Sequence, residues 1–79
     1  MKEGYLGWNY KEKRYGMLDR DLWVIAGFHC GDCFEVFING EWKPTRIELA
    51  RPEQTYYLID TDLAGEELEH RRIRINDEK

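Results

Sequence analysis

A chain of 79 residues is expected to form one small domain, which hides roughly 60–65% of the surface of the unfolded chain. The formal net charge of −4 gives no general attraction to phosphate backbones or anionic membranes, although a local basic patch is compatible with it. Serine is absent, which excludes a serine nucleophile, and the 14% of aromatic residues favours strands.

The first third of the chain predicts three strands. Residues 4–9 alternate so that Leu6 and Trp8 share a face, and the polar residues 10–14 form a turn. Residues 15–18 return as the second strand. The third, residues 22–26, is apolar on both faces, and we therefore expect it in the centre of the sheet.

The middle of the chain predicts a β-hairpin. Residues 33–38 alternate and end at Asn39-Gly40, the pair that a type I′ turn needs because both central residues have positive φ. The return strand covers residues 42–49. One face of it carries Thr45, Ile47 and Leu49, and the other carries Arg46 and Glu48.

The last third predicts a strand over residues 55–60, at most one short helical turn near residues 61–68, a strand over residues 72–75 and a frayed polar tail at 76–79. The whole chain, residues 1–79, is therefore one all-β domain of six or seven short antiparallel strands. A small, partly open β-barrel, SH3-like or similar, buries such strands most economically and limits exposed edges.

We expect a cytoplasmic protein that does not cross a membrane. The longest apolar run, residues 22–26, is far shorter than the roughly 20 residues that a spanning helix needs. The N-terminus shows no apolar export segment with a small-residue cleavage site.

The two cysteines, Cys30 and Cys33, form a Cys-x-x-Cys pair. Redox chemistry would need a helix after the first cysteine to lower its pKa, and here a strand follows. Zinc needs four ligands, so Cys30 and Cys33 could hold it only with ligands from elsewhere, for instance across a symmetric dimer. The alternative is two half-buried structural thiols beside a bend, with no metal and no other cofactor.

Two surfaces are candidates for binding. Trp42 and Arg46 point to the same side of one strand, and both residue types are enriched at protein-binding hot spots. Tyr57 could extend this patch, or be a core ring. The second candidate is a basic face for nucleic acid built from Arg71, Arg72 and Arg74, although acidic neighbours would partly cancel its field.

The sequence also resembles an uncharacterised family of small proteins, a domain of unknown function, over residues 4–75. The resemblance is carried by His29-Cys30-Gly31-Asp32, Phe34-Glu35-Val36, Asn39-Gly40-Glu41-Trp42, Pro44-Thr45-Arg46-Ile47-Glu48 and Tyr57-Leu58. It implies a setting in Gram-positive bacteria, their phages and mobile elements, and a second cysteine that varies among members. Because the family carries no assigned activity, the resemblance implies no mechanism.

The residues support no enzyme, because they assemble no nucleophile with its base, no phosphate loop and no complete metal site. The predicted function is a non-enzymatic binding or accessory module for a protein partner. The alternatives are a weak nucleic-acid-binding barrel and a zinc-bridged dimer. The sequence leaves the oligomeric state open.

Overall fold

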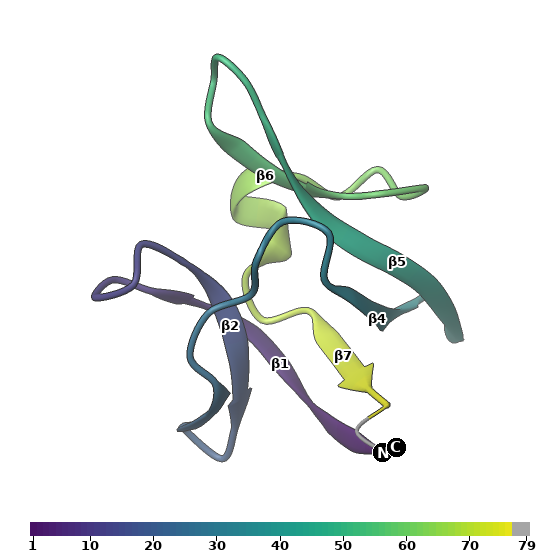
Figure 1. The fold of residues 1–79 in the computed structure, drawn as a ribbon. Coiled ribbons are helices and arrows are strands. Elements are labelled where there is room, and N and C mark those ends of the chain that lie inside the picture. The colour runs from purple at the N-terminus through teal and green to yellow at the C-terminus, as the bar shows by residue number, and fades with distance from the viewer. Residues whose placement is uncertain (77–79) are drawn as a thin grey trace.

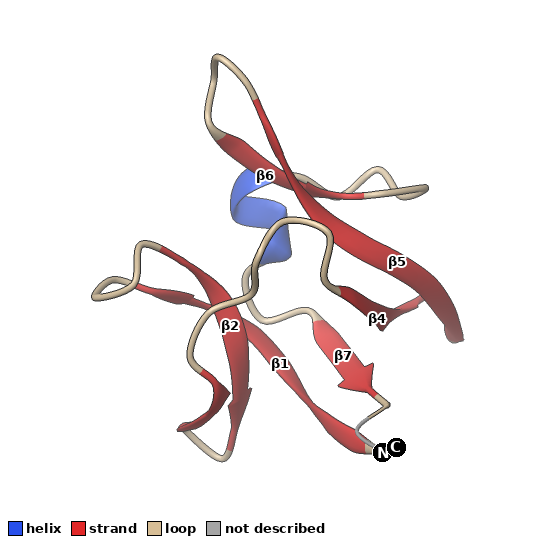
Figure 2. Cartoon of the chain, viewed as in Figure 1, coloured by secondary structure: helices blue, strands red, loops and turns tan. Residues whose placement is uncertain are grey.

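The computed structural model describes residues 1–76, which form seven strands and one 3₁₀ turn (Figures 1 and 2). In chain order these elements are β1 (Lys2–Asn9), β2 (Arg14–Asp19), β3 (Leu22–Ile25), β4 (Cys33–Ile38), β5 (Glu41–Ala50), β6 (Thr55–Leu58), η1 (Gly65–Leu68) and β7 (Arg72–Ile75). The expectation of an all-β domain with one short helical turn is confirmed.

All strands join one open antiparallel sheet in the order β3-β2-β1-β7-β4-β5-β6. The long strand β5 has two neighbours along its length: residues 41–46 pair with β4 and residues 47–50 pair with β6. The sheet bends at β5, so that β6 faces the β1–β2 hairpin, and η1 lies between them (Figure 1). The result is a small open barrel.

The core fills the inside of this bend. Every strand except β3 places at least one buried apolar side chain there, and Leu63 and Leu68 from the segment around η1 close it. Thr45 is also buried, and its hydroxyl donates a hydrogen bond to the Ile59 carbonyl at 2.7 Å, which satisfies the one polar side chain that β5 buries. Thr45, Ile47 and Leu49 share one side of β5, as predicted; Thr45 and Ile47 are buried and Leu49 is half-buried.

The predicted hairpin is present with its predicted turn. Asn39 and Gly40 both have positive φ, +52° and +82°. The turn places Phe37 opposite Trp42 and Cys33 opposite Arg46. Local turn chemistry therefore sets the register of the whole β4–β5 pair.

The central position expected for residues 22–26 is wrong, because β3 is an edge strand. Leu22 is 71% exposed and Trp23 is 41% exposed, whereas Val24 and Ile25 pack against the core. An irregularity in the β2–β3 pairing beside Leu18 accompanies this division. The apolar residues of β3 are divided: the first two lie on the exposed surface and the last two pack against the core. The strand is therefore not covered on both faces, as a central strand would be.

The helical turn η1 starts at Gly65, whose φ is +60°. Before it, the Thr61 hydroxyl donates to the Leu58 carbonyl and accepts from the Leu63 amide, which ties residues 58–63 into a compact turn. The predicted tail lies outside the described residues except for exposed Asn76. Within residues 1–76 there is no helix with the length and apolar character needed to cross a membrane.

Candidate binding surface

The outer face of the sheet carries one continuous cross-strand row. Residues directly opposite each other on antiparallel strands point to the same side, so the pairing register identifies the members of a row. Starting at β3, the row consists of Trp23, Leu18, Tyr5, Arg72, Phe37 and Trp42, and we call it the outer row. The link from Arg72 to Phe37 is a side-chain contact, in which the guanidinium group lies over the ring. It crosses six of the seven strands that the structure describes, a span of about 24 Å at the usual spacing between strands.

Gly7 lets one end of the outer row lie close to the backbone. A Cβ atom at this position would be 2.6 Å from Leu18 Cδ1 and 3.6 Å from Trp23 Cη2. Both side chains therefore cover the place where a side chain would stand. Tyr5, the next member of the row, is 50% exposed.

At the other end of the row, two guanidinium groups lie over aromatic rings. Arg74 is 4.4 Å from the centre of the Trp42 ring, and Arg72 is 5.3 Å from Phe37 and 5.6 Å from Trp42. Phe37 and Trp42 contact each other at 5.0 Å between ring centres. These distances are within the range of cation–π attraction. Trp42 is half-buried as a result and remains part of the surface.

The arginine charges on this face are paired. Arg74 Nε donates to Glu35 Oε1 at 2.5 Å, and Arg72 pairs with Glu3. Arg46 Nε donates to Glu48 Oε2 at 2.8 Å, and this hydrogen bond raises the pKa of the Arg46 guanidinium. The outer face is therefore rich in arginine without being strongly positive.

The structure places the three predicted contact residues on one face. Trp42 and Arg46 lie on the outer side of β5, separated by about 13 Å along the strand. Tyr57 of β6 is opposite Glu48 and so points to the same side. Trp42 belongs to the outer row, while Arg46 and Tyr57 lie beyond its end.

The three arginines predicted for nucleic acid do not form one group. Arg72 and Arg74 share the outer face with Trp42. Arg71 precedes β7, and its Nε donates to the Glu67 carbonyl of η1 at 3.1 Å. It also lines a surface pocket with Asp60 and Asp62, which are acidic. The Trp42 patch and the Arg72–Arg74 patch, treated as separate in the sequence, are one surface.

Both cysteines are exposed, so the prediction of half-buried thiols is wrong. They flank a tight bend in which the Asp32 carboxylate accepts the His29 amide at 2.8 Å, which leaves the thiols pointing outward. In the part of the chain that the structure describes, no three His, Cys, Asp or Glu side chains gather as metal ligands. Zinc at Cys30 and Cys33 would need ligands from a second chain, and this remains a prediction.

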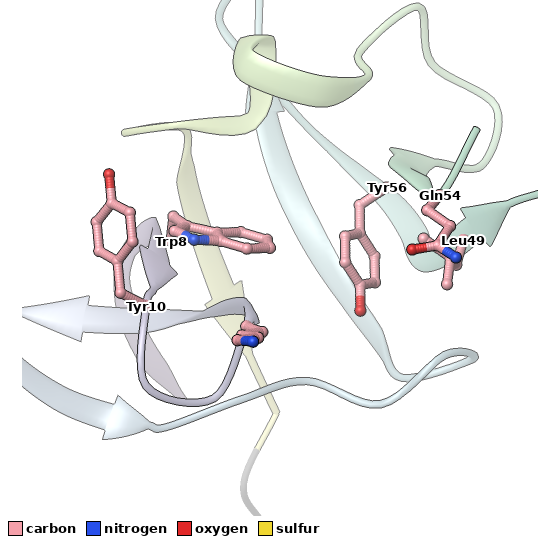
Figure 3. A pocket seen from close by; sticks show the side chains of 6 residues that line it. Trp8, Tyr10, Leu49, Gln54 and Tyr56 are labelled. Atoms are coloured by element: carbon pink, nitrogen blue, oxygen red, sulfur yellow. The ribbon is translucent and has the colours of Figure 1, made fainter.

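A second aromatic group, which the sequence did not reveal as a site, lies on the inner side of the sheet. The Trp8 ring is 5.1 Å from Tyr15 and 6.2 Å from Tyr56, measured between ring centres. A pocket of about 410 Å³ opens between Trp8 and Tyr56, with Tyr10 at its far rim (Figure 3). The alternation of β1 indicated the direction of Trp8, but no local signal places β6 across from it.

Comparison with known proteins identifies the family and no activity. The structure is similar to a crystal structure of a protein from Ruminococcus gnavus determined by the Northeast Structural Genomics Consortium, with a TM-score of 0.76 and 31% sequence identity over 94% of this chain and 100% of that one. Among curated proteins, none matches the chain. The family model that matches residues 4–75 is described as Domain of unknown function (DUF5348), and the chain belongs to this family.

Proposed function

We propose that this protein is a non-enzymatic binding module whose outer face docks onto a protein partner. The observation that carries the proposal is the outer row, a strip of aromatic, leucine and arginine side chains that crosses six strands. Trp, Tyr and Arg are the residue types that most often dominate the energy of protein interfaces. Arg46 and Tyr57 extend the strip.

The charges favour protein over nucleic acid as the partner. Arg46, Arg72 and Arg74 each have a glutamate partner, and the chain as a whole carries a net charge of −4. A phosphate backbone would have to compete with these glutamates, whereas a protein surface can use the aromatic rings and leave the ion pairs intact.

The proposal includes the setting of the protein. We place it in the cytoplasm, in Gram-positive bacteria or their phages and mobile elements, and with a partner encoded nearby.

The test compares outer-face residues with a residue on the opposite side of the sheet. Tyr5 belongs to the outer row and Arg46 extends it, whereas Lys43 of β5 is exposed and, by strand alternation, points to the other side. In a pull-down from the native host with tagged protein, Tyr5→Ala and Arg46→Ala should each reduce recovery of the partner by about tenfold. Lys43→Ala should recover it at the wild-type level, and all three variants should keep the wild-type melting temperature.

Equal recovery by all variants, or loss with Lys43→Ala alone, would show that the outer row does not bind the partner. Trp42→Ala is a less suitable probe, because removing Trp42 also removes the ring beneath Arg72 and Arg74. Nuclease treatment of the lysate distinguishes a protein contact from one bridged by nucleic acid.

A second candidate function is weak binding of single-stranded nucleic acid. The specific observation is that Arg72 lies between Tyr5 and Phe37 in the outer row, and bases stack on such alternating aromatic and cationic groups. It predicts increased fluorescence anisotropy of a labelled oligonucleotide at low salt that falls steeply as salt rises. No change with either DNA or RNA at low salt would remove this candidate.

A further inference from the structure

We propose that a pocket on the inner side of the sheet binds an arginine side chain of a partner protein. The pocket has a volume of about 530 Å³ and is separate from the outer row. It is lined by Trp8, Tyr10, Tyr15, Glu66 and Glu69, and we call it the acidic pocket. The site combines aromatic walls with two carboxylates.

The aromatic walls are fixed by the β1–β2 hairpin. The Trp8 and Tyr15 rings meet edge to face at 5.1 Å and 75°, and the Tyr15 hydroxyl donates to the Gly65 carbonyl at 3.0 Å. Asn9 holds the turn, because its side-chain oxygen accepts the amides of residues 11 and 12 and its amide group donates to the Ala26 carbonyl. Tyr10 is exposed at the rim of this rigid frame, which leaves its ring available to a ligand.

The η1 segment supplies the charge. Glu69 Oε1 accepts the backbone amide of Trp8 at 3.0 Å, which fixes this carboxylate beside the Trp8 backbone in the wall of the pocket. The Glu66 carboxylate is exposed and makes no hydrogen bond or ion pair with any residue in 1–76. Within residues 1–76, no lysine or arginine side chain lines the acidic pocket. The pocket therefore presents negative charge that the described part of the chain does not neutralise.

The field of these carboxylates is evident at Tyr15. Its pKa is raised chiefly by burial of the phenol, and further by Glu69 and Glu66. Lys13 lines the neighbouring pocket with Tyr56 and does not line the acidic pocket. The two carboxylates are therefore the charged groups in the lining of the acidic pocket.

A guanidinium group matches this chemistry better than an ammonium group. It is planar and weakly hydrated, so it stacks on tryptophan and tyrosine rings, and its fork of N–H donors can reach two carboxylate oxygens together. The free carboxylate of Glu66 provides the ion pair, and the rings of Trp8 and Tyr10 provide the stacking surfaces. We therefore assign the pocket to arginine.

The experiment titrates ¹⁵N-labelled full-length protein with N-acetyl-arginine amide and follows the indole N–H resonance of Trp8, assigned with Trp8→Phe. The probe should shift this resonance in a saturable way and leave those of Trp23 and Trp42, on the outer face, in place. N-acetyl-citrulline amide has nearly the same shape and no charge, and it should give no saturable shift. N-acetyl-lysine amide should bind at least about threefold more weakly.

The matched pair of variants is Glu66→Gln and Glu41→Gln, which remove the same charge from exposed positions. Glu66 lines the acidic pocket, while Glu41 is at the β4–β5 turn. Glu66→Gln should weaken binding of the arginine probe about fivefold or more, and Glu41→Gln should leave it unchanged. An absent shift, an equal shift with citrulline or lysine, or equal effects of the two variants would overturn the assignment. Because the probe needs no partner, the result does not depend on the outer row.

Discussion

Arg74 joins two kinds of interaction in one side chain, a hydrogen-bonded ion pair with Glu35 and a stack on Trp42. Arg74→Lys keeps the charge and removes the planar group, so it should lower the free energy of unfolding by about 0.5–1 kcal/mol. Urea unfolding measures this change. Arg20→Lys is the control: Arg20 is 91% exposed and 3.7 Å from Asp19, and we expect a change near zero. Equal losses in both variants would contradict a role for the stack.

Tyr15 makes stability depend on alkaline pH. Burial and the nearby Glu69 and Glu66 raise its pKa above the ordinary tyrosine value of about 10. The unfolded chain therefore loses this proton at lower pH than the folded protein, and the free energy of unfolding should fall as pH rises above about 10. Tyr15→Phe should show a smaller fall between about pH 9 and 11 in urea unfolding. Tyr5→Phe, on the outer face, keeps Tyr15 and should show the same fall in the free energy of unfolding as the wild type. An identical fall in the wild type, Tyr15→Phe and Tyr5→Phe would refute the role of Tyr15.

Single residues also show how far the sequence predicts a surface. Strand parity was sufficient to place Trp42 and Arg46 on the same side of β5. It did not show that Trp42 has Arg74 as its nearest cation, because that contact is made through the pairing of β7 with β4. The separation of Arg71 from Arg72 arises because Arg71 lies before β7 and donates to Glu67 of η1, a contact that strand parity does not predict.

At the scale of elements, β7 is the strand on which the sheet depends most. It pairs with β1 on one side and β4 on the other, and Ile73 is fully buried between Gly4 and Val36. Ile73→Ala should therefore cost about 2–5 kcal/mol of unfolding free energy in urea. Ile75→Ala removes the same atoms from a half-buried position, so it should lower the free energy of unfolding clearly less. Equal costs would show that the centre of the sheet is not more tightly packed than its end.

Elements with local signals were predicted correctly, and those that depend on distant partners were not. The β4–β5 hairpin follows from Asn39-Gly40, which determines its own turn. The place of β3 does not follow from its composition, because an apolar strand can sit at an edge when one of its rings covers a glycine on a nearby strand. A sequence read by periodicity gives the strands but not the order in which they pair.

For the whole molecule, the all-β class and the open barrel could be predicted from chain length, strand spacing and the lack of a helical period. The outer row and the acidic pocket could not. The row exists only when five strand pairings have the observed register, since a slip of one residue would turn a strand's side chains to the other face. The pocket requires η1 to meet the tip of the β1–β2 hairpin, a contact between segments about fifty residues apart.

The central place of β7 also affects how the protein is made. Synthesis delivers β1 to β6 before β7. Until β7 emerges, the β1–β3 and β4–β6 groups have no strand between them, and β1 and β4 each expose an unpaired edge. The ribosome must release nearly all of the described chain before the sheet can form as one unit. A pause in translation just before β7 would therefore prolong the stage at which the nascent chain is most prone to pair with its neighbours.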